Sequence, residues 1–327
     1  MANFLAVGDI HYKTGNKDQT DRLEQLVLDQ LEGLDFVILL GDVLHDFSRV
    51  YTRVKSRTIS FIRELANILP TYVIIGNHDF VNNQQYLTDN HAFEGIEIEN
   101  TTFVSKPTHF SYSGKRFLAI PYVPVGKLDE VVDPHMNDVN LVFAHQELYG
   151  ADIHSGVESE ADEWKYDVPI ISGHIHRPQV VGEFVIYSGA SIQTNFGETW
   201  DTSVVRGKLS NRLKYERIST TITGRLLTVR LRAIDLFNNV WPECHENDKI
   251  RLQVEGLPEE LKRLKRDFKD KLKGYDKVMY INLRGEIPAT NQFPQLNTVD
   301  DMIGGLAKRI DNFDDDHREI FLDCTDR

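Results

Sequence analysis

Short clusters of aspartate, asparagine and histidine follow runs of aliphatic residues at several places in the first 180 residues of the chain. This arrangement places metal-binding side chains at the points where buried strands end and loops begin. Its repetition along one sequence is difficult to obtain by chance. The clusters are Asp9-Ile10-His11, Gly41-Asp42 with His45, Gly76-Asn77-His78-Asp79, His145 and Gly173-His174-Ile175-His176.

The aliphatic runs are short and rich in Val, Ile, Leu and Phe, which is typical of strands in a sheet covered on both faces. Helical patterns at residues 20–31 and 51–69 lie between the early strands and indicate parallel βαβ units. The functional loops of such units gather at the carboxyl ends of the strands. We therefore expect all the clusters at one edge, with strands at residues 3–7, 36–40, 72–75, 117–120, 141–144, 170–172 and 185–187.

The clusters offer carboxylate, imidazole and amide groups but no thiolate. Such donors suit Mn, Fe, Zn or Mg, and the lack of cysteine argues against a closed structural zinc site. The seven candidate ligands are too many for one ion. Two ions about 3.5–4 Å apart, sharing a bridging carboxylate, are the economical arrangement, and such a pair can clamp a phosphoryl group during displacement.

These residues resemble the signature of the calcineurin-like metallophosphoesterases, which reads D-x-H, G-D, G-N-H-D, H and G-H-x-H. The resemblance implies a four-layer α/β core, in which β-sheets are flanked by helices, and two divalent ions, with manganese expected first. It implies that Asp42 bridges the ions. One ion would be held by Asp9, His11 and His176, and the other by Asn77, His145 and His174.

The same resemblance implies roles for two residues that do not bind metal. His78 matches the family histidine that stabilises or protonates the leaving group, and Asp79 would orient it through a hydrogen bond. A hydroxide shared by the two ions is the expected nucleophile.

Three further segments resemble the SbcD-type nucleases, the nuclease subunits of double-strand-break repair complexes. Residues 41–45 are similar to the family's G-D-L-F-H, and His45 would help to position DNA. Residues 145–146 match its H-Q. Residues 187–198 are similar to its Y-S-G-S-P-x-x-x-S-F-x-E segment, which is the most discriminating match. The implied activity is cleavage of duplex ends and of single-stranded DNA, together with an SMC-like ATPase.

Two departures from the family pattern suggest a diverged member of this group, such as a viral one. Tyr12-Lys13 stands where the family has L-G, and Ser191 stands where it has proline. His45 has a second interpretation, as a loop residue that supports the site. The alternative function is a phosphatase or phosphodiesterase of the same fold that acts on a small molecule or a phosphoprotein.

The rhythm of the sequence changes after residue 220, which indicates a second unit. We predict a phosphoesterase domain at 1–220 and a ββαβ cap at 221–297, with strands at 225–232, 249–255 and 277–283 and a helix at 258–273. In the SbcD-type nucleases, such a cap lies beside the active site and helps to direct DNA into it. The helix and acidic tail at 298–327 either bind the ATPase partner or form a solvated terminus.

Charge and composition set limits on the partners. The net charge of −13 argues against broad affinity for nucleic acid, although bound cations and a basic partner could offset it. Basic residues on the 258–273 helix are either a DNA-binding strip or a solvated face. Residues 50–69 are a candidate homodimer seam, although ordinary packing on the sheet explains their apolar face nearly as well. Two cysteines and no apparent signal or membrane segment lead us to expect a cytoplasmic protein, in the host cytoplasm if it is viral.

Overall fold

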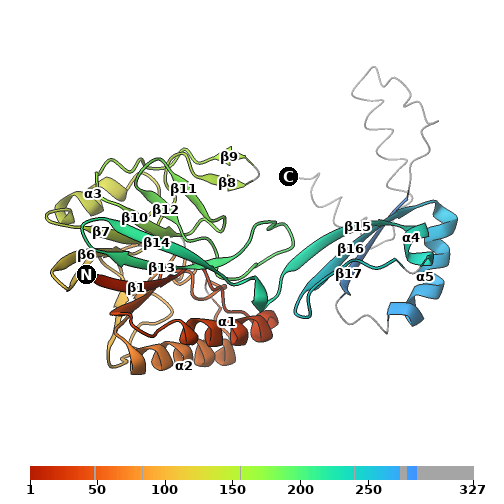
Figure 1. Ribbon diagram of the computed structural model, residues 1–327, viewed down its shortest axis with the longest axis horizontal. Helices are drawn as coiled ribbons and strands as arrows, with labels where there is room; N and C mark the ends of the chain where they lie inside the picture. The colour runs from red at the N-terminus through yellow and green to blue at the C-terminus, as the bar shows by residue number, and fades with distance from the viewer. Residues whose placement is uncertain (48, 83, 155, 239, 273–277, 286–327) are drawn as a thin grey trace, which may run out of the picture.

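The computed structural model describes residues 1–327 except 48, 83, 155, 239, 273–277 and 286–327. Two six-stranded β-sheets pack face to face, and a three-stranded sheet lies to one side of them (Figure 1). No helix in these described ranges is long and apolar enough to cross a membrane.

The first sheet has the strand order β14-β13-β1-β2-β3-β4. Strands β1 to β4 run parallel, and the β13–β14 hairpin adds to β1 in the antiparallel sense. Its strands are β1 (Ala2–Val7), β2 (Phe36–Leu39), β3 (Thr71–Ile74), β4 (Thr101–Val104), β13 (Ser203–Leu209) and β14 (Leu213–Ser219).

The second sheet has the order β11-β12-β10-β7-β6-β5, with a parallel centre and antiparallel edges. A short hairpin of β8 (Asp152–His154) and β9 (Val157–Glu158) forms a separate two-stranded sheet. The strands of the sheet are β5 (Thr108–Tyr112), β6 (Lys115–Ile120), β7 (Leu141–His145), β10 (Ile170–Gly173), β11 (Gln179–Val181) and β12 (Val185–Tyr187).

Aromatic side chains fill the space between the two sheets. Phe4, Phe36, Phe117 and Phe143 are all fully buried there, and the ring centroids of Phe4 and Phe143 lie 5.0 Å apart in an edge-to-face contact. Gly207 on β13 lies so close to the Phe4 ring that a side chain at this position would clash. The inner faces of the two sheets therefore form one continuous core.

Helices cover the outer faces of the sheets and complete four layers. Helices α1 (Lys17–Asp29) and α2 (Thr52–Ile68) pack Leu23, Phe61 and Leu65 against the first sheet, and α3 (Leu128–Val132) packs on the second. The apolar face of α2, the predicted dimer seam, is thus used within the chain. Short 3-10 turns occur at η1 (Thr14–Asn16), η2 (Asp133–His135) and η3 (Thr221–Thr223).

The fold class predicted from the sequence is confirmed, and every strand predicted in the core is present. The strands belong to two sheets, and five of them were not predicted, namely the edge strands β4, β5, β11 and β14 and the inner strand β13. Edge strands expose part of their surface, and β14 is largely exposed along its length. Because their sequences are mixed in polarity, they lack the apolar runs on which the prediction depended.

The small sheet is built from the parallel strands β15 (Leu226–Arg232), β16 (Lys249–Gly256) and β17 (Val278–Gly285). The predicted ββαβ order omitted α4 (Ala233–Phe237), which connects β15 to β16 and is too short to show a helical period. Together with α5 (Pro258–Leu272), it covers one face of the sheet (Figure 1). The predicted helix and tail at 298–327 lie outside the described residues, and the domain boundaries stay a prediction.

Candidate metal centre

The carboxyl ends of five inner strands, and the loops that follow them, carry all seven predicted ligands. Strands β1, β2 and β3 of the first sheet lead to Asp9 and His11, to Asp42, and to Asn77 respectively. In the second sheet, His145 is the last residue of β7, and His174 and His176 follow β10. Since these strands end at one edge of the sandwich, polar groups far apart in the sequence meet there.

The first group consists of Asp9, His11 and His176, whose potential ligand atoms all lie within 4.8 Å of one another. The Nε2 atoms of His11 and His176 are 3.0 Å apart. Asp9 and His11 are buried, whereas His176 is partly exposed. This group contains side chains from both sheets.

The second group surrounds the amide oxygen of Asn77. This Oδ1 atom lies 2.9 Å from His145 Nε2 and 3.0 Å from His174 Nδ1, and the two ring nitrogens are 3.3 Å apart. His145 is fully buried and donates its Nδ1–H to the carbonyl of Leu40 at 2.7 Å. That bond leaves Nε2 of His145 to face the group.

Asp42 lies between the two groups. Its Oδ1 atom is 3.3 Å from His145 Nε2, and its Oδ2 atom is 3.6 Å from His11 Nε2. The Oδ1 atom also accepts the backbone N–H of His78 at 2.8 Å. Each oxygen of one buried carboxylate therefore faces a different group, which is the arrangement required of a bridging ligand.

The donor set fits two divalent cations. Metal–nitrogen bonds of about 2.0–2.1 Å bring neighbouring ligand atoms to roughly 3 Å from each other, close to the separations found here. Pairs of imidazole nitrogens that face each other at 3.0 and 3.3 Å repel unless a proton or a cation lies between them. Which residues bind each ion nevertheless stays a prediction from the family pattern.

The electrostatics of the buried groups are consistent with this fit. Burial holds the pKa of His11 well below its usual value, which favours the neutral ring that binds metal. Burial opposes ionisation of Asp42, but the His145 and His11 rings outweigh it and lower the pKa of this carboxyl. Burial also lowers the pKa of His145, yet Asp42 raises it to about 9. A cation held by Asp42 and His145 would take the place of the proton that this raised pKa keeps on His145.

The backbone around the centre has an unusual conformation. Four predicted ligands, none of them glycine, have positive φ angles: Asp9 (34°), His11 (51°), Asp42 (47°) and His174 (77°). Gly173 packs against the carbonyl of Leu40 with no room for a side chain, since an added Cβ would lie 2.6 Å from that oxygen. Left-handed backbone in residues other than glycine is strained and clusters at functional sites.

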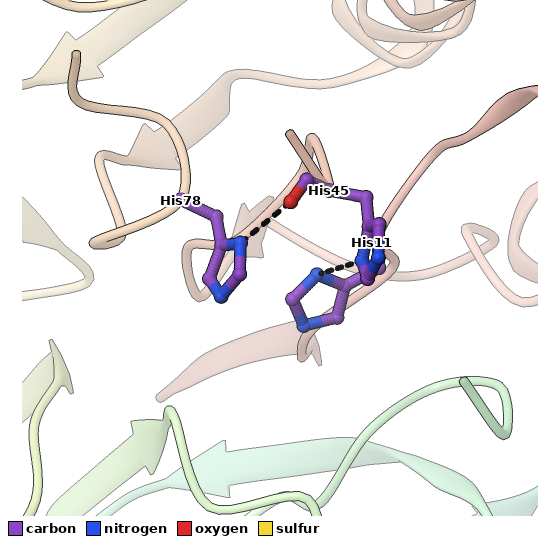
Figure 2. A group of neighbouring side chains, drawn as sticks. All are labelled: His11, His45 and His78. Atoms are coloured by element: carbon purple, nitrogen blue, oxygen red, sulfur yellow. Dashed lines mark hydrogen bonds between the residues drawn. The ribbon is translucent and has the colours of Figure 1, made fainter. Parts of the chain in front are cut away.

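His45 links the centre to His78 (Figure 2). Its ring Nδ1 lies 3.3 Å from Nδ1 of His11, and its backbone carbonyl lies 2.6 Å from Nδ1 of His78. The Nε2 atom of His78 is 3.9 Å from Oδ2 of Asp42, and the Phe47 ring stacks on His78 at a centroid distance of 4.2 Å. His78 therefore faces the centre without belonging to either group.

The predicted role of Asp79 needs correction. We expected this carboxylate to orient the His78 ring, but that ring is held by the carbonyl of His45. Asp79 is fully buried and accepts the backbone N–H groups of Leu44 at 2.9 Å and Gly76 at 3.0 Å. It therefore fixes the loops after β2 and β3 to each other, and a backbone carbonyl performs the task expected of it.

Three side chains near the centre were not predicted from the sequence. Phe47 stacks on His78, Glu198 accepts Nδ1–H of His176 at 2.7 Å, and Glu147 lies 3.7 Å from Nε2 of His174. Glu198 is the last residue of the 187–198 segment, and Glu147 directly follows the His145-Gln146 pair. The sequence marked both segments but gave no indication of what these side chains contact.

Two facing sheets with a centre of Asp, Asn and His side chains at their strand ends define the class of the metallophosphoesterases. The family model of the calcineurin-like phosphoesterases matches residues 2–178, and the chain belongs to this family. Proteins of the family use a dimetal centre, and the clustered His and Asp side chains could bind such metals.

The similar proteins include two from viruses. Protein 244L of Invertebrate iridescent virus 6, named as a phosphoesterase, is 31% identical over 80% of this chain and 97% of its own length. Protein 078R of Invertebrate iridescent virus 3, named likewise, is 32% identical over 67% of this chain and 66% of its own length. The expectation of a viral type of sequence agrees with these relatives.

Solved structures with a similar arrangement include Vps29 of Chaetomium thermophilum and the nuclease MPE of Pseudomonas putida. The first is 12% identical, with a TM-score of 0.35 over 67% of this chain and 98% of its own. The second is 16% identical, with a TM-score of 0.32 over 62% of this chain and 83% of its own. At these sequence identities and TM-scores, the two structures carry no information about the substrate of this protein.

Proposed function

We propose that this phosphoesterase is a metal-dependent DNA nuclease of the SbcD type, which hydrolyses phosphodiester bonds at duplex ends and in single strands. The observation that carries the proposal is the position of His45. It touches the predicted ligand His11 through its ring and His78 through its carbonyl, and it ends the segment that resembles the G-D-L-F-H of those nucleases.

In this proposal the two groups of side chains described above hold one divalent cation each, with Asp42 shared. When bound, such cations act as Lewis acids on a phosphoryl group and lower the pKa of coordinated water. His78 gives a proton to the departing sugar oxygen from Nε2, because its Nδ1–H is donated to His45. His45 orients the strand from the exposed side of the site.

The rest of the chain is assigned roles that follow from this function. Residues 221–297 would direct DNA toward the centre, and an SMC-like ATPase and a second copy of the chain would complete the assembly. Their contribution would include positive charge, since the chain itself has a net charge of −13. The cations supply the attraction for phosphate at the centre.

A test of this proposal compares substrates under one condition. With Mn²⁺ present, linear duplex DNA and single-stranded DNA should be cleaved far faster than p-nitrophenyl phosphate. His45→Ser should reduce cleavage of duplex ends more than cleavage of single strands, and His135→Ser, a histidine outside the centre, should change neither. Equal losses on both DNA substrates would contradict a role of His45 in positioning the strand.

A phosphatase for small molecules is the second candidate. A pocket of 280 Å³ adjoins the centre and is lined by His174, His176, Arg177, Asn195 and Trp200, among others. The Arg177 guanidinium and the Trp200 ring, both beside the predicted ligands, suit a compact phosphoester. Rapid hydrolysis of a nucleoside monophosphate, with intact DNA in the same assay, would favour this function over the nuclease.

A further inference from the structure

Glu198 makes a short contact with a predicted metal ligand. Its Oε1 atom accepts the ring Nδ1–H of His176 at 2.7 Å, and only 4% of Glu198 is exposed. On the other side of the same ring, Nε2 lies 3.0 Å from Nε2 of His11. One nitrogen of His176 is therefore occupied by a carboxylate, and the other faces the first group of ligands.

The loop that carries Glu198 fixes the direction of its carboxylate. Thr194 donates its backbone N–H at 2.7 Å and its hydroxyl at 2.6 Å, and Asn195 donates its side-chain amide at 3.0 Å. With His176, four donors converge on two oxygens. Hydrogen bonds to an ionised group are stronger than neutral ones, so this carboxylate is held firmly in place.

We propose that Glu198 is a positioning residue for metal binding, which keeps His176 in the Nδ1–H tautomer and aims Nε2 at the ion shared with Asp9 and His11. A carboxylate that accepts the second N–H of a ligand histidine fixes the orientation of the ring and raises its basicity. The inference rests on the metal centre and is independent of DNA as the substrate.

The chain contains its own comparison. His174 has a carboxylate on its outer side too, but Oε2 of Glu147 lies 3.7 Å from Nε2 of that ring, beyond hydrogen-bond length. Glu147 instead accepts the hydroxyl of Ser159 at 2.7 Å. Removing Glu147 should therefore disturb its histidine much less than removing Glu198.

The experiment measures Mn²⁺ binding by calorimetry and the ring tautomer by nitrogen-15 NMR of the metal-free protein. In Glu198→Ala, we expect one of two Mn²⁺ sites to weaken by about 10- to 100-fold and the other to keep its affinity. The His176 ring should change from the Nδ1–H form to a mixture of tautomers. Glu198→Gln retains an acceptor and should give an intermediate loss, and Glu147→Ala should change affinity only slightly.

Two results would overturn the inference. Wild-type affinity at both sites in Glu198→Ala would show that the contact has no effect on binding. An equal loss at both sites, with an unchanged His176 tautomer, would show that Glu198 acts on the fold in general. If Glu198→Ala fails to fold, Glu198→Gln decides the question by the same criteria, because it retains the volume of the side chain.

Discussion

Four predicted ligands have left-handed backbone, which costs roughly 1–2 kcal/mol for each residue other than glycine. The folded protein accepts this strain because the side chains at these positions point into the centre. A substitution that removes the side chain therefore has two opposite effects: it abolishes a metal contact, and it can relieve the backbone.

His174 allows these effects to be separated. With φ at 77°, we expect His174→Gly to be more stable in EDTA than His174→Ala by about 1 kcal/mol, measured by urea unfolding. At His176, which has no positive φ, the order should reverse, and Ala should be the more stable by roughly 0.4–1 kcal/mol. If the alanine variant were the more stable at His174 as well as at His176, the backbone at His174 would not be strained.

His78 should affect catalysis while leaving the metals in place. Because it faces the centre without joining either group, His78→Gln should reduce kcat by about 100-fold or more while both Mn²⁺ ions still bind. Parallel measurements of hydrolysis and of metal content check this expectation. Loss of an ion together with activity would identify His78 as a ligand.

The predicted site residues could be listed from sequence because each lies in a short segment after an apolar strand. Their contacts could not be predicted, because hydrogen-bond partners depend on how loops from two sheets meet. Asp79 illustrates the limit: it is adjacent to His78 in sequence, but its carboxylate accepts N–H groups from the neighbouring loop. Glu198 is the converse, a distant residue that contacts a predicted ligand.

The segment at 193–198 connects the small sheet with the metal centre. The Gln193 side chain accepts the backbone N–H of Leu226 on β15 at 2.6 Å and donates to the carbonyl of Glu198 at 2.6 Å. Thr228, further along β15, donates its hydroxyl to the carbonyl of Phe196 at 3.1 Å. The start of β15 therefore supports the loop that holds His176.

Removal of Gln193 should loosen this connection. In Gln193→Ala, the partly buried N–H of Leu226 and the buried carbonyl of Glu198 lose their partner, and the buried carbonyl alone costs about 1–3 kcal/mol. We expect faster hydrogen exchange at Leu226 and across residues 194–198, measured by mass spectrometry. Gln25→Ala, which removes an exposed side-chain bond on α1, serves as the control and should leave exchange there unchanged.

The turn before β16 carries the buried Asp248, which pairs with Arg225, a residue whose side chain is 31% exposed. Asp248 accepts hydrogen bonds from the backbone and guanidinium of Arg225, at 2.9 and 2.7 Å for the closest. Burial raises the pKa of this carboxyl, but the bonds from Arg225 outweigh it and hold the pKa below the usual value of 3.8. A lowered pKa means that the ionised form stabilises the fold.

The sign of the pH dependence follows from this shift. The stabilisation from Asp248 is fully present above its usual pKa and is lost as the pH falls through the lower folded value. Wild type should therefore lose stability in this acid range more steeply than Asp248→Asn, measured by urea unfolding at several pH values. Identical slopes for the two proteins would contradict the assignment.

Strands also differ in how well they could be predicted from the sequence. Central strands such as β2 are buried along their whole length, so their composition alone identified them. β13 carries Arg206 and Lys208 within an inner strand, and its pairing with β1 could not be inferred from an apolar run. Pairing over such sequence distances is decided by packing, here by Gly207 against Phe4.

At the level of the whole molecule, metal binding should stabilise the fold. Loops from both sheets supply the centre, and a ligand that binds only the folded state adds about 2.7 kcal/mol at a concentration 100 times its Kd. Mn²⁺ should raise the melting temperature, EDTA should lower it, and Asp42→Asn should lose most of the increase. Calorimetric melting of both proteins with and without Mn²⁺ provides the measurement.

The division of the centre between two sheets has a structural consequence. Asp9 and His11 extend from the first sheet and His176 from the second, and Asn77 lies likewise opposite His145 and His174. A cation bound at either group would link side chains of one sheet to side chains of the other. Removal of bound cations should therefore loosen the contact between the two sheets at this edge, while the aromatic core continues to hold them together elsewhere.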